Sequence, residues 1–238
     1  MRADGRGPDM LRPIRFETGF VRTATGSCLA SFGDTRVICT VTVDDRVPGW
    51  MSGRGRGWLT AEYAMLPAST GRRKPRDGRK NAHVDGRTVE IQRLVGRTLR
   101  PSVDLDRLGE LTLHVDCDVL EADGGTRTCA ISGSSVALVE ALKVLERDEK
   151  IPSGCLRNRV SAVSVGVVDG ELLLDLAYSE DSRAESDINV VMDEENRFLE
   201  VQGTAEGRPF SRQELGAALD MAAGGIAQIL EVARDGSA

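Results

Sequence analysis

The sequence predicts an α+β fold in which strands and helices pack in layers. Two observations support this prediction: short apolar or alternating segments bounded by turn residues, typical of strands, and longer segments with apolar residues at helical spacing. A third is their order, a few strands and then helix, which occurs twice. The 238 residues, 40% of them hydrophobic, suffice for two such halves to share one core. We therefore expect a single domain over residues 1–238.

The predicted strands are bounded by glycine and aspartate turns. In order, the strand segments are residues 26–43 (two strands joined at Gly33 and Asp34), 57–66, 111–120, 159–178 (two strands around Asp169 and Gly170) and 189–203 (a second hairpin).

Three segments have the periodicity of amphipathic helices. The first, 87–100, and the second, which follows a glycine loop at 123–128, place their apolar residues on one face. The third, 211–233, starts with Ser211 and Glu214 at the spacing of a capping box. The apolar face residues are Ile91, Leu94, Val95 and Leu99 in the first helix and Ile131, Leu138, Leu142 and Leu145 in the second.

The net charge of -6 conceals two unlike halves. Residues 1–100 carry 19 Lys and Arg against 10 Asp and Glu, whereas the remaining residues carry 12 against 27. Six basic residues lie within 72–80, "RRKPRDGRK". Such a run is either a solvated loop or an electrostatic clamp for a polyanion, which would bind by releasing counterions.

Five scattered cysteines without a C-x-x-C pair and only two histidines argue against a zinc site. We expect reduced, buried thiols in a cytoplasmic protein. The start lacks the apolar stretch of a signal peptide, and no apolar run approaches the ~18 residues of a membrane span, so no membrane is expected as a partner.

The stretch "DGGTRT" (123–128) places an arginine in the first turn of a helix, where the helix dipole disfavours a cation. Gly124 and Gly125 allow the backbone to approach a ligand closely. Backbone N–H groups, the dipole and the Arg127 guanidinium together favour a bound anion such as phosphate. The alternative is a glycine turn with Arg127 bent toward a surface carboxylate. No G-x-x-x-x-G-K-[ST] loop occurs.

The stretch "DGRTVEIQRL" (85–94) repeats this arrangement, with a glycine, Arg87 and then a helix. Two arginines at two helix starts could hold one phosphate from different sides. Taken alone, Arg87 is equally well explained as a surface residue in a capped first turn.

Four carboxylates crowd "YSEDSRAESDINVVM" (178–192), namely Glu180, Asp181, Glu185 and Asp187. Like charges this close repel unless they are solvated or bridged by a cation. A small number of oxygen ligands suits Mg²⁺, which takes one or two carboxylates and a substrate phosphate. A solvated acidic loop is the alternative.

The stretch "SGRGRGW" (52–58) does not fit the G-x-G-x-x-G dinucleotide motif. It is either a loop that brings Arg54 and Arg56 near a polyanion or a purely structural turn.

These motifs together resemble the ribonuclease PH family of phosphorolytic 3′-to-5′ exoribonucleases that trim tRNA ends. The resemblance covers nearly the whole chain. It is carried by "RADGRGPDMLRPI", "GSCLASFGDTRVICT", "GWLTAEYAMLP", "GRTVEIQRLVGRTLR", "VDCDVLEADGGTRTCAISG", "DLAYSEDSRAESDINVVM" and "EVQGTAEGRPFS".

The resemblance implies a fold of two β-α modules of the ribosomal protein S5 domain 2-like type. It implies that Gly125, Thr126 and Arg127 bind phosphate together with Arg87, and that Asp181 and Asp187 bind Mg²⁺, so that Arg127, Asp181 and Asp187 are the catalytic residues. Inorganic phosphate would be the co-substrate, and tRNA precursors and other RNA 3′ ends the substrates, in a homohexamer built as a trimer of dimers.

The resemblance also implies that Arg73 and Arg76 contact RNA. Ala68 departs from the family pattern, which has arginine there, so either the grip on RNA is weaker at this point or Arg72 and Arg79 replace the missing arginine. A non-catalytic RNA-binding subunit of an exosome-like ring is the main alternative. A small-molecule kinase would need an ATP loop, which the sequence lacks.

Overall fold

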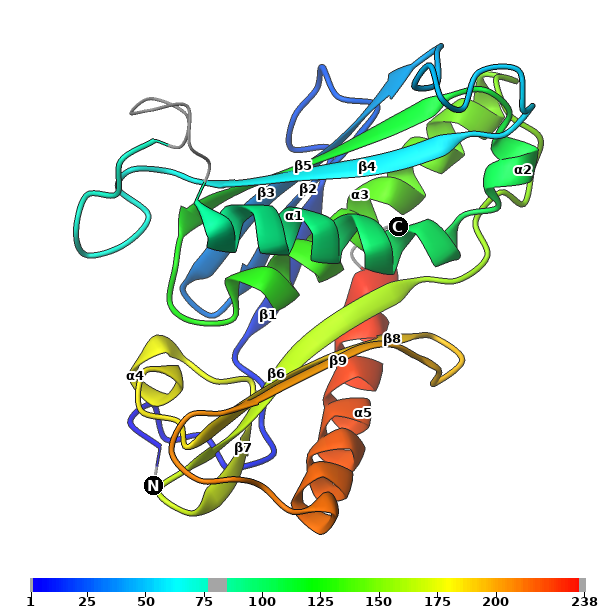
Figure 1. The fold of residues 1–238 in the computed structure, drawn as a ribbon. Coiled ribbons are helices and arrows are strands. Elements are labelled where there is room, and N and C mark those ends of the chain that lie inside the picture. Colours follow the sequence, from blue (N-terminus) through cyan, green and yellow to red (C-terminus); the bar gives the residue numbers. More distant parts are fainter. Residues whose placement is uncertain (1, 77–84, 236–238) are drawn as a thin grey trace.

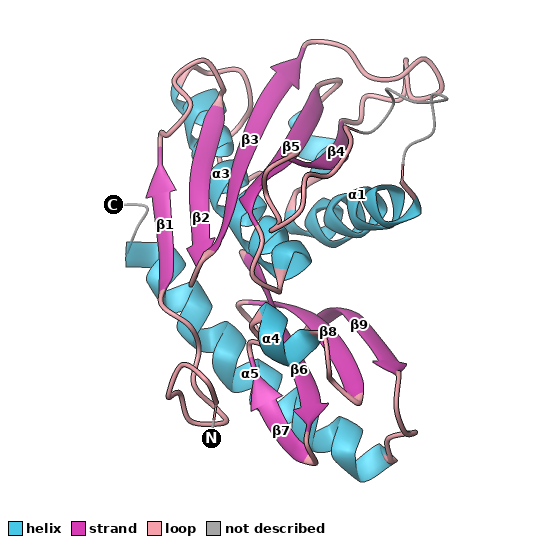
Figure 2. Ribbon diagram, turned by 90° about the vertical axis from the view of Figure 1, so that its left-hand side faces the viewer, coloured by secondary structure: helices cyan, strands magenta, loops and turns pink. Residues whose placement is uncertain are grey.

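The computed structural model describes residues 2–76 and 85–235. Within these ranges the chain forms two β-sheets with helices packed against them (Figure 1). The two sheets lie one above the other, and the short helix α4 lies near their junction (Figure 2).

The first sheet has the strand order β1-β2-β3-β5-β4. Its pairs are antiparallel except β4 with β5, which are parallel. The tight turn between β2 and β3 is made at Gly33, whose φ is 57°. The strands are β1 (Ile14–Thr18), β2 (Gly26–Phe32), β3 (Thr35–Asp44), β4 (Trp58–Met65) and β5 (Thr112–Glu121).

The second sheet has the order β7-β6-β8-β9, and all its pairs are antiparallel. Asp169 and Gly170 both have positive φ, 51° and 78°, as a two-residue hairpin turn requires. The strands are β6 (Val160–Val168), β7 (Glu171–Leu174), β8 (Ser186–Asp193) and β9 (Phe198–Ala205).

Helix α3 lies between the two sheets, against β2 and β3 on one side and β6 on the other. It approaches the first sheet closely at Gly133, where a Cβ would lie 2.7 Å from that of Ala30. Helix α1 packs on β4, and α5 packs on β6, β8 and β1. The helices are α1 (Gly86–Leu99), a 3-10 helix (Arg100–Ser102), α2 (Leu105–Leu108), α3 (Thr126–Arg147), α4 (Tyr178–Asp181) and α5 (Arg212–Asp235).

The predicted helices and strands are confirmed, and every apolar residue assigned to a helix face is buried. The Ser211–Glu214 capping box is present in both directions, at 2.7 and 3.1 Å. One buried apolar cluster runs from Phe16 to Ala233 and so includes both halves. The elements β1, α2 and α4 are short and were not predicted.

All five cysteines are free and buried, as expected, and burial raises the pKa of Cys28 to about 12. The expectation about apolar segments was too strict. Among the described residues, α3 and α5 are long and apolar enough to cross a membrane by length and composition alone. The apolar part of α3 is mostly buried inside the fold. Of the apolar part of α5, only a third is buried.

Candidate active site

A cleft of about 780 Å³ opens where the starts of α1 and α3 face α4, β8 and β9. Six residues predicted for phosphate and metal binding line it, although they come from four elements spread over a hundred positions. These residues are Arg87, Gly125, Thr126, Arg127, Asp181 and Asp187. The structure therefore brings the residues predicted to bind phosphate and the carboxylates predicted to bind a metal into one cleft.

The start of α3 forms one wall of the cleft. Gly124 and Gly125 have φ of 75° and 64°, and a Cβ at Gly124 would lie 2.6 Å from the Leu176 carbonyl oxygen. Gly125 is the N-cap, no side chain caps the helix, and its first turn has no acidic residue. Because the first N–H groups of a helix have no partner within it, this uncapped start offers donors and positive potential to an anion.

The Arg127 side chain is only 18% exposed and stays in the cleft. Its guanidinium donates to Gln202 Oε1 at 2.9 Å and lies 3.4 Å from Glu90 Oε1. The alternative considered from sequence, a contact with a nearby carboxylate, is thus partly realised through Glu90. Both partners line the same cleft, so Arg127 is held at its wall and is not turned away from it.

Arg87 lies in the first turn of α1, and its side chain is exposed. Unlike α3, this helix is capped: the Asp85 side chain accepts from the Arg87 backbone N–H at 3.4 Å, and Lys74 pairs with the same carboxylate at 3.1 Å. The capped-turn explanation of the sequence is therefore correct for the backbone. The Arg87 guanidinium nevertheless lines the cleft, and its charge lowers the pKa of Asp181, against the larger effect of burial.

Tyr63 was not predicted to belong to the site. It is 2% exposed, and its hydroxyl lies 3.0 Å from Thr126 Oγ1. Burial raises the pKa of the Tyr63 hydroxyl, which therefore remains a proton donor. With Tyr63 donating to Thr126, the Thr126 hydroxyl can direct its own proton toward a ligand.

Asp181 ends α4, and Asp187 lies in β8, so the acidic stretch is not the solvated loop considered from sequence. Burial raises the pKa of both carboxyls, and the Asp181 charge raises that of Asp187 further. Asn189 donates to Asp187 Oδ2 at 2.9 Å. The other oxygen, Oδ1, is buried without a hydrogen-bond partner.

This pair fits a divalent cation. Asp187 has a buried oxygen without a donor, and the neighbouring Asp181 charge raises its proton affinity; Mg²⁺ with a few waters would satisfy both carboxylates. No group of three or more His, Cys, Asp or Glu residues suited to a metal exists among residues 2–76 and 85–235. The two predicted carboxylates would thus need water and substrate oxygens as the remaining ligands.

The remaining carboxylates of this stretch have arginine partners. Glu180 forms two 2.7 Å hydrogen bonds with the Arg2 guanidinium, and Glu185 pairs with Arg208 at 3.0 Å. Burial alone would raise the pKa of Glu180, but the Arg2 contacts hold it below its usual value. Of the four crowded carboxylates, only Asp181 and Asp187 are left for a ligand.

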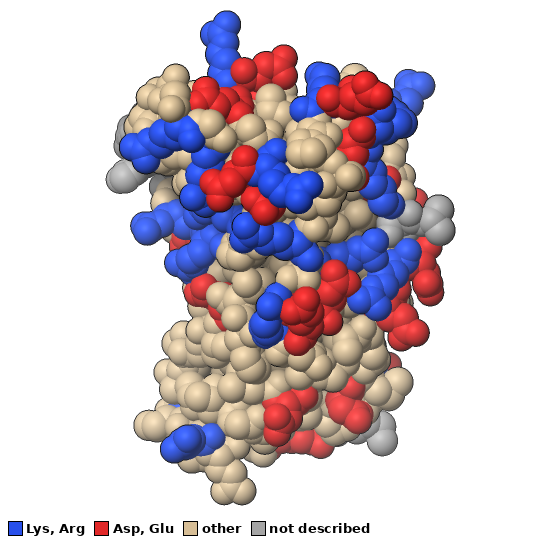
Figure 3. All heavy atoms as spheres, turned by 90° about the vertical axis from the view of Figure 1, so that its right-hand side faces the viewer, with Lys and Arg blue, Asp and Glu red and all other residues tan. Residues whose placement is uncertain are grey.

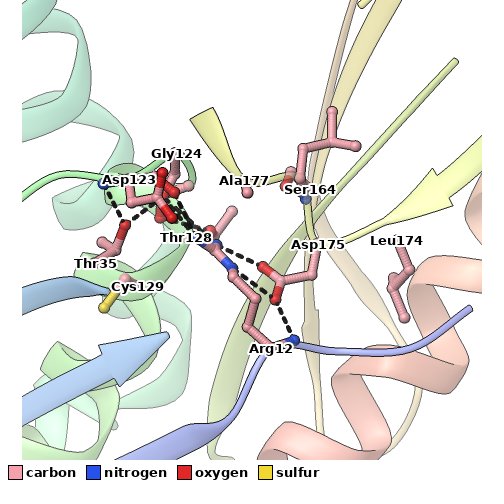
Figure 4. A network of polar contacts seen from close by, with 12 residues as sticks. Arg12, Thr35, Asp123, Gly124, Thr128, Cys129, Ser164, Leu174, Asp175 and Ala177 are labelled. Atoms are coloured by element: carbon pink, nitrogen blue, oxygen red, sulfur yellow. Dashed lines mark hydrogen bonds and ion pairs between the residues drawn. The ribbon is translucent and has the colours of Figure 1, made fainter. Parts of the chain in front are cut away.

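A buried network ties the glycine loop to the second sheet (Figure 4). The Arg12 guanidinium binds both oxygens of Asp175, at 2.7 and 3.0 Å, and donates to the carbonyl of Asp123. Thr35 accepts from the Asp123 N–H and donates to the Gly124 carbonyl, at 2.8 and 2.7 Å. Asp175 is fully buried, and Arg12 holds its pKa low against the effect of burial.

Arg2, Arg12 and Asp175 were not predicted to belong to the site. The only signal was the arginine spacing in "RADGRGPDMLR", in which Arg6 pairs locally with Asp4 but Arg2 and Arg12 do not pair locally. The two arginines bind carboxylates 178 and 163 positions away, so no sequence window contains both partners.

A second cavity of about 740 Å³ adjoins the cleft and shares Arg87, Gly125, Thr126 and Asp181 with it. Arg72 and Lys74 of the basic loop and the 63%-exposed ring of Tyr178 line it. Arg73 and Arg76 are exposed and are not among the residues that line either cavity. Arg79 lies outside the described residues. Ala68 is exposed in the loop after β4.

The two-sheet α+β fold, with a cleft that joins a phosphate-type wall to a pair of carboxylates, defines a protein of the RNase PH-like, phosphorolytic 3′ exoribonuclease class. The chain belongs to the 3′ exoribonuclease family: models of its domain 1 and domain 2 match residues 10–143 and 158–225.

Solved structures share this fold. Rice (Oryza sativa) Rrp46 is 23% identical with a TM-score of 0.78, and the match covers 98% of both chains. A chain of the Archaeoglobus fulgidus exosome with RNA bound to the active site is 22% identical with a TM-score of 0.81, covering 97% of this chain and 91% of that one. A chain of an archaeal exosome core is 21% identical with a TM-score of 0.77, covering 98% and 91%.

Proposed function

We propose that the protein is a phosphate-dependent 3′-to-5′ exoribonuclease that trims the 3′ ends of tRNA precursors and releases nucleoside 5′-diphosphates. The observation that carries the proposal is the cleft itself. An uncapped helix start and two arginines face two carboxylates, one of which keeps a buried oxygen without a donor. Family membership supports the same reaction.

The chain's residues would bind and aim the attacking phosphate. Arg127, Arg87, the Thr126 hydroxyl and the first N–H groups of α3 converge on an anion in the cleft. Since inorganic phosphate is already an anion at pH 7, it needs no general base. Its oxygen would form a bond to the last phosphorus atom of the RNA while the bond to the preceding 3′-oxygen breaks, leaving a 3′-hydroxyl and a nucleoside diphosphate.

Asp181 and Asp187 would hold Mg²⁺. When bound, this ion neutralises charge on the scissile phosphate and on the leaving oxygen. The adjoining cavity, with Arg72, Lys74 and Tyr178, would hold the terminal nucleotide beside the attacking phosphate. Because one phosphate ester bond is exchanged for another, the same cleft would also add nucleotides from diphosphates.

The test is incubation of the protein with 3′-extended tRNA and Mg²⁺, with and without phosphate, and identification of the released nucleotide. Diphosphates that appear only with phosphate support the proposal, and monophosphates would indicate hydrolysis instead. Arg127→Ala should lower the rate by about 10³-fold, as loss of one group that stabilises transition-state charge does. Arg147→Ala, at the other end of α3, is the matched control.

A non-catalytic RNA-binding subunit of an exosome-like ring is the second candidate. The observation that favours it is that the similar structures include exosome chains. In the same assay this candidate predicts RNA binding with neither product released.

Assembly and location complete the proposal. A homohexamer built as a trimer of dimers, in the cytoplasm, would place the exposed Arg73 and Arg76 of several copies around one RNA. Replacing both by glutamine should weaken RNA binding and reduce the salt dependence of the binding constant. An unchanged salt slope would exclude their role as an RNA clamp.

A further inference from the structure

A pocket of about 420 Å³ lies at the far end of α1 from the cleft. It is built by the loop between β3 and β4, the start of β4, the 3-10 helix and the segment before β6. Its polar lining consists of four arginines, Arg54, Arg56, Arg100 and Arg157. The loop is the "SGRGRGW" stretch, for which the sequence left a polyanion contact and a structural turn equally open.

Aromatic rings complete the pocket. Trp58 lines it, and the Arg100 guanidinium lies over the Trp58 ring at 4.9 Å. Trp50 packs edge-on against Trp58, with ring centroids 4.9 Å apart, and is 58% exposed. A large exposed indole beside planar guanidinium groups offers stacking surfaces for a flat ligand.

The positive charge of the pocket is only partly neutralised. Arg56 lies 3.5 Å from Asp106, and Arg157 lies 3.3 Å from Asp104, both at the rim. Glu110 accepts from the Gly55 N–H.

The two other cations have no such partner. Among residues 2–76 and 85–235, no carboxylate forms an ion pair with Arg54 or Arg100. Burial and the nearby Arg97 lower the pKa of Arg100, which indicates a cation in a site short of negative charge. An anion would relieve both effects.

The pocket is separate from the cleft. Arg87 is in the first turn of α1 and Arg100 follows its last residue, so the 14-residue helix separates them by about 20 Å at 1.5 Å per residue. On the face of the molecule that carries α2 and this end of α1, Lys and Arg gather over the upper part with carboxylates between them (Figure 3).

We propose that this pocket binds a nucleotide, with its phosphate held among Arg54, Arg100 and Arg157 and its base stacked on the exposed Trp50 ring. The source of the nucleotide is either a single-stranded segment of RNA or a free mononucleotide, since both present the same phosphate and base. Apart from naming RNA as one source, the inference does not depend on the proposed reaction.

The chain carries its own probe for this pocket. Trp50 and Trp58 are its only two tryptophans, and both lie here, so tryptophan fluorescence reports on this site and not on the cleft. We expect a 12-nucleotide oligoadenylate, added without phosphate or Mg²⁺, to change the fluorescence in a saturable way. A parallel titration with AMP distinguishes the sources: saturation by AMP at a similar concentration indicates free nucleotides, and a response to the oligonucleotide alone indicates RNA.

The test variant is Arg54→Gln/Arg157→Gln. Both side chains are exposed, so the fold should be retained, and the dissociation constant should rise about tenfold on loss of two phosphate contacts. Arg15→Gln/Arg147→Gln removes the same charge from exposed positions elsewhere and should leave the constant unchanged.

Three results would overturn the inference: no fluorescence change under conditions where anisotropy shows that RNA is bound, equal constants for both double variants, or a change of oligomeric state in Arg54→Gln/Arg157→Gln by light scattering. Arg127→Ala should keep the fluorescence response. A wild-type protein without phosphorolysis but with the arginine-dependent response would refute the proposed reaction and support the pocket.

Discussion

Two pairs of carboxylates lie side by side in the second half of the chain and have opposite environments. Asp175 and Glu180 are buried against Arg12 and Arg2, and their pKa values are held below the usual range. Asp181 and Asp187 are also withdrawn from water, but among residues 2–76 and 85–235 no cation forms an ion pair with them, and burial raises their pKa values.

The difference separates structure from function. A carboxylate that accepts every available hydrogen bond stabilises the fold and has no capacity left for a ligand. A carboxylate that keeps a buried oxygen without a donor, as Asp187 does, destabilises the fold until something binds it. The arginine-bound pair holds α4 and the glycine loop in place, so that the unpaired pair faces the start of α3.

Breaking the arginine-bound pair should have the largest effect. Asp175→Asn leaves the Arg12 guanidinium buried without its counter-charge, which should lower the free energy of unfolding by about 3–5 kcal/mol. Urea denaturation measures this. Asp169→Asn, in an exposed pair with Arg183, should change it by less than about 1 kcal/mol. Equal losses in the two variants would show that burial of the pair is not what matters.

Breaking the unpaired pair should cost activity and not stability. Asp187→Asn should lower kcat about 10²-fold, as removal of one charge-stabilising group does. The same change removes a buried, repelled charge, so the melting temperature should rise by about 2 °C. Activity assays and thermal melts of one preparation test both. A melting temperature that falls together with kcat would place Asp187 with the structural pair.

Mg²⁺ should stabilise the wild-type protein but not Asp187→Asn. At ten times its dissociation constant, the ion should raise the free energy of unfolding by about 1.4 kcal/mol. Asp187→Asn should show no such gain, whereas Asp169→Asn should respond as the wild type does. Calorimetry with and without MgCl₂ measures the shift, and an equal shift in Asp187→Asn would contradict the metal assignment.

The gain in melting temperature of Asp187→Asn over the wild type should depend on pH. The folded-state pKa of Asp187 is raised above its usual 3.8, so ionisation disfavours the fold, and stability is lost as pH rises through the folded pKa. Toward about pH 3, below the usual pKa of 3.8, the carboxyl becomes protonated in both states, and the difference in melting temperature should disappear. Melts from pH 3 to 8 follow this, and a constant difference would point to packing instead of charge.

Removing one hydroxyl from the phosphate wall should have the smallest effect. Tyr63→Phe loses the hydrogen bond that orients Thr126, which should raise KM for phosphate about 3- to 5-fold with little change in kcat. Phosphate saturation curves measure it. An unchanged KM would mean that Thr126 needs no orientation.

The fold could be predicted well from the sequence because each long helix and each hairpin has a local signal. The spacing of Ile91, Leu94 and Val95 and the turn at Asp169 and Gly170 are examples, and both are as predicted. The strand β1 has five residues and α4 has four, too short for a period to be visible.

The site could be predicted in part. Local anomalies, an arginine at a helix start and crowded carboxylates, identified Arg127 and Asp187 as candidates. They could not tell Asp187 from Glu180, because the Arg2 that neutralises Glu180 is 178 positions away. Tyr63 had no signal at all, since an apolar strand with one tyrosine is common.

By itself, the sequence determined the helices, the hairpins and the chemical types available for an anion and a cation. Only the tertiary structure decided which charged groups remain free, because neutralisation depends on distance in space and not along the chain. Here Arg2 and Arg12 form ion pairs with Glu180 and Asp175. The remaining carboxylates, Asp181 and Asp187, face the start of α3.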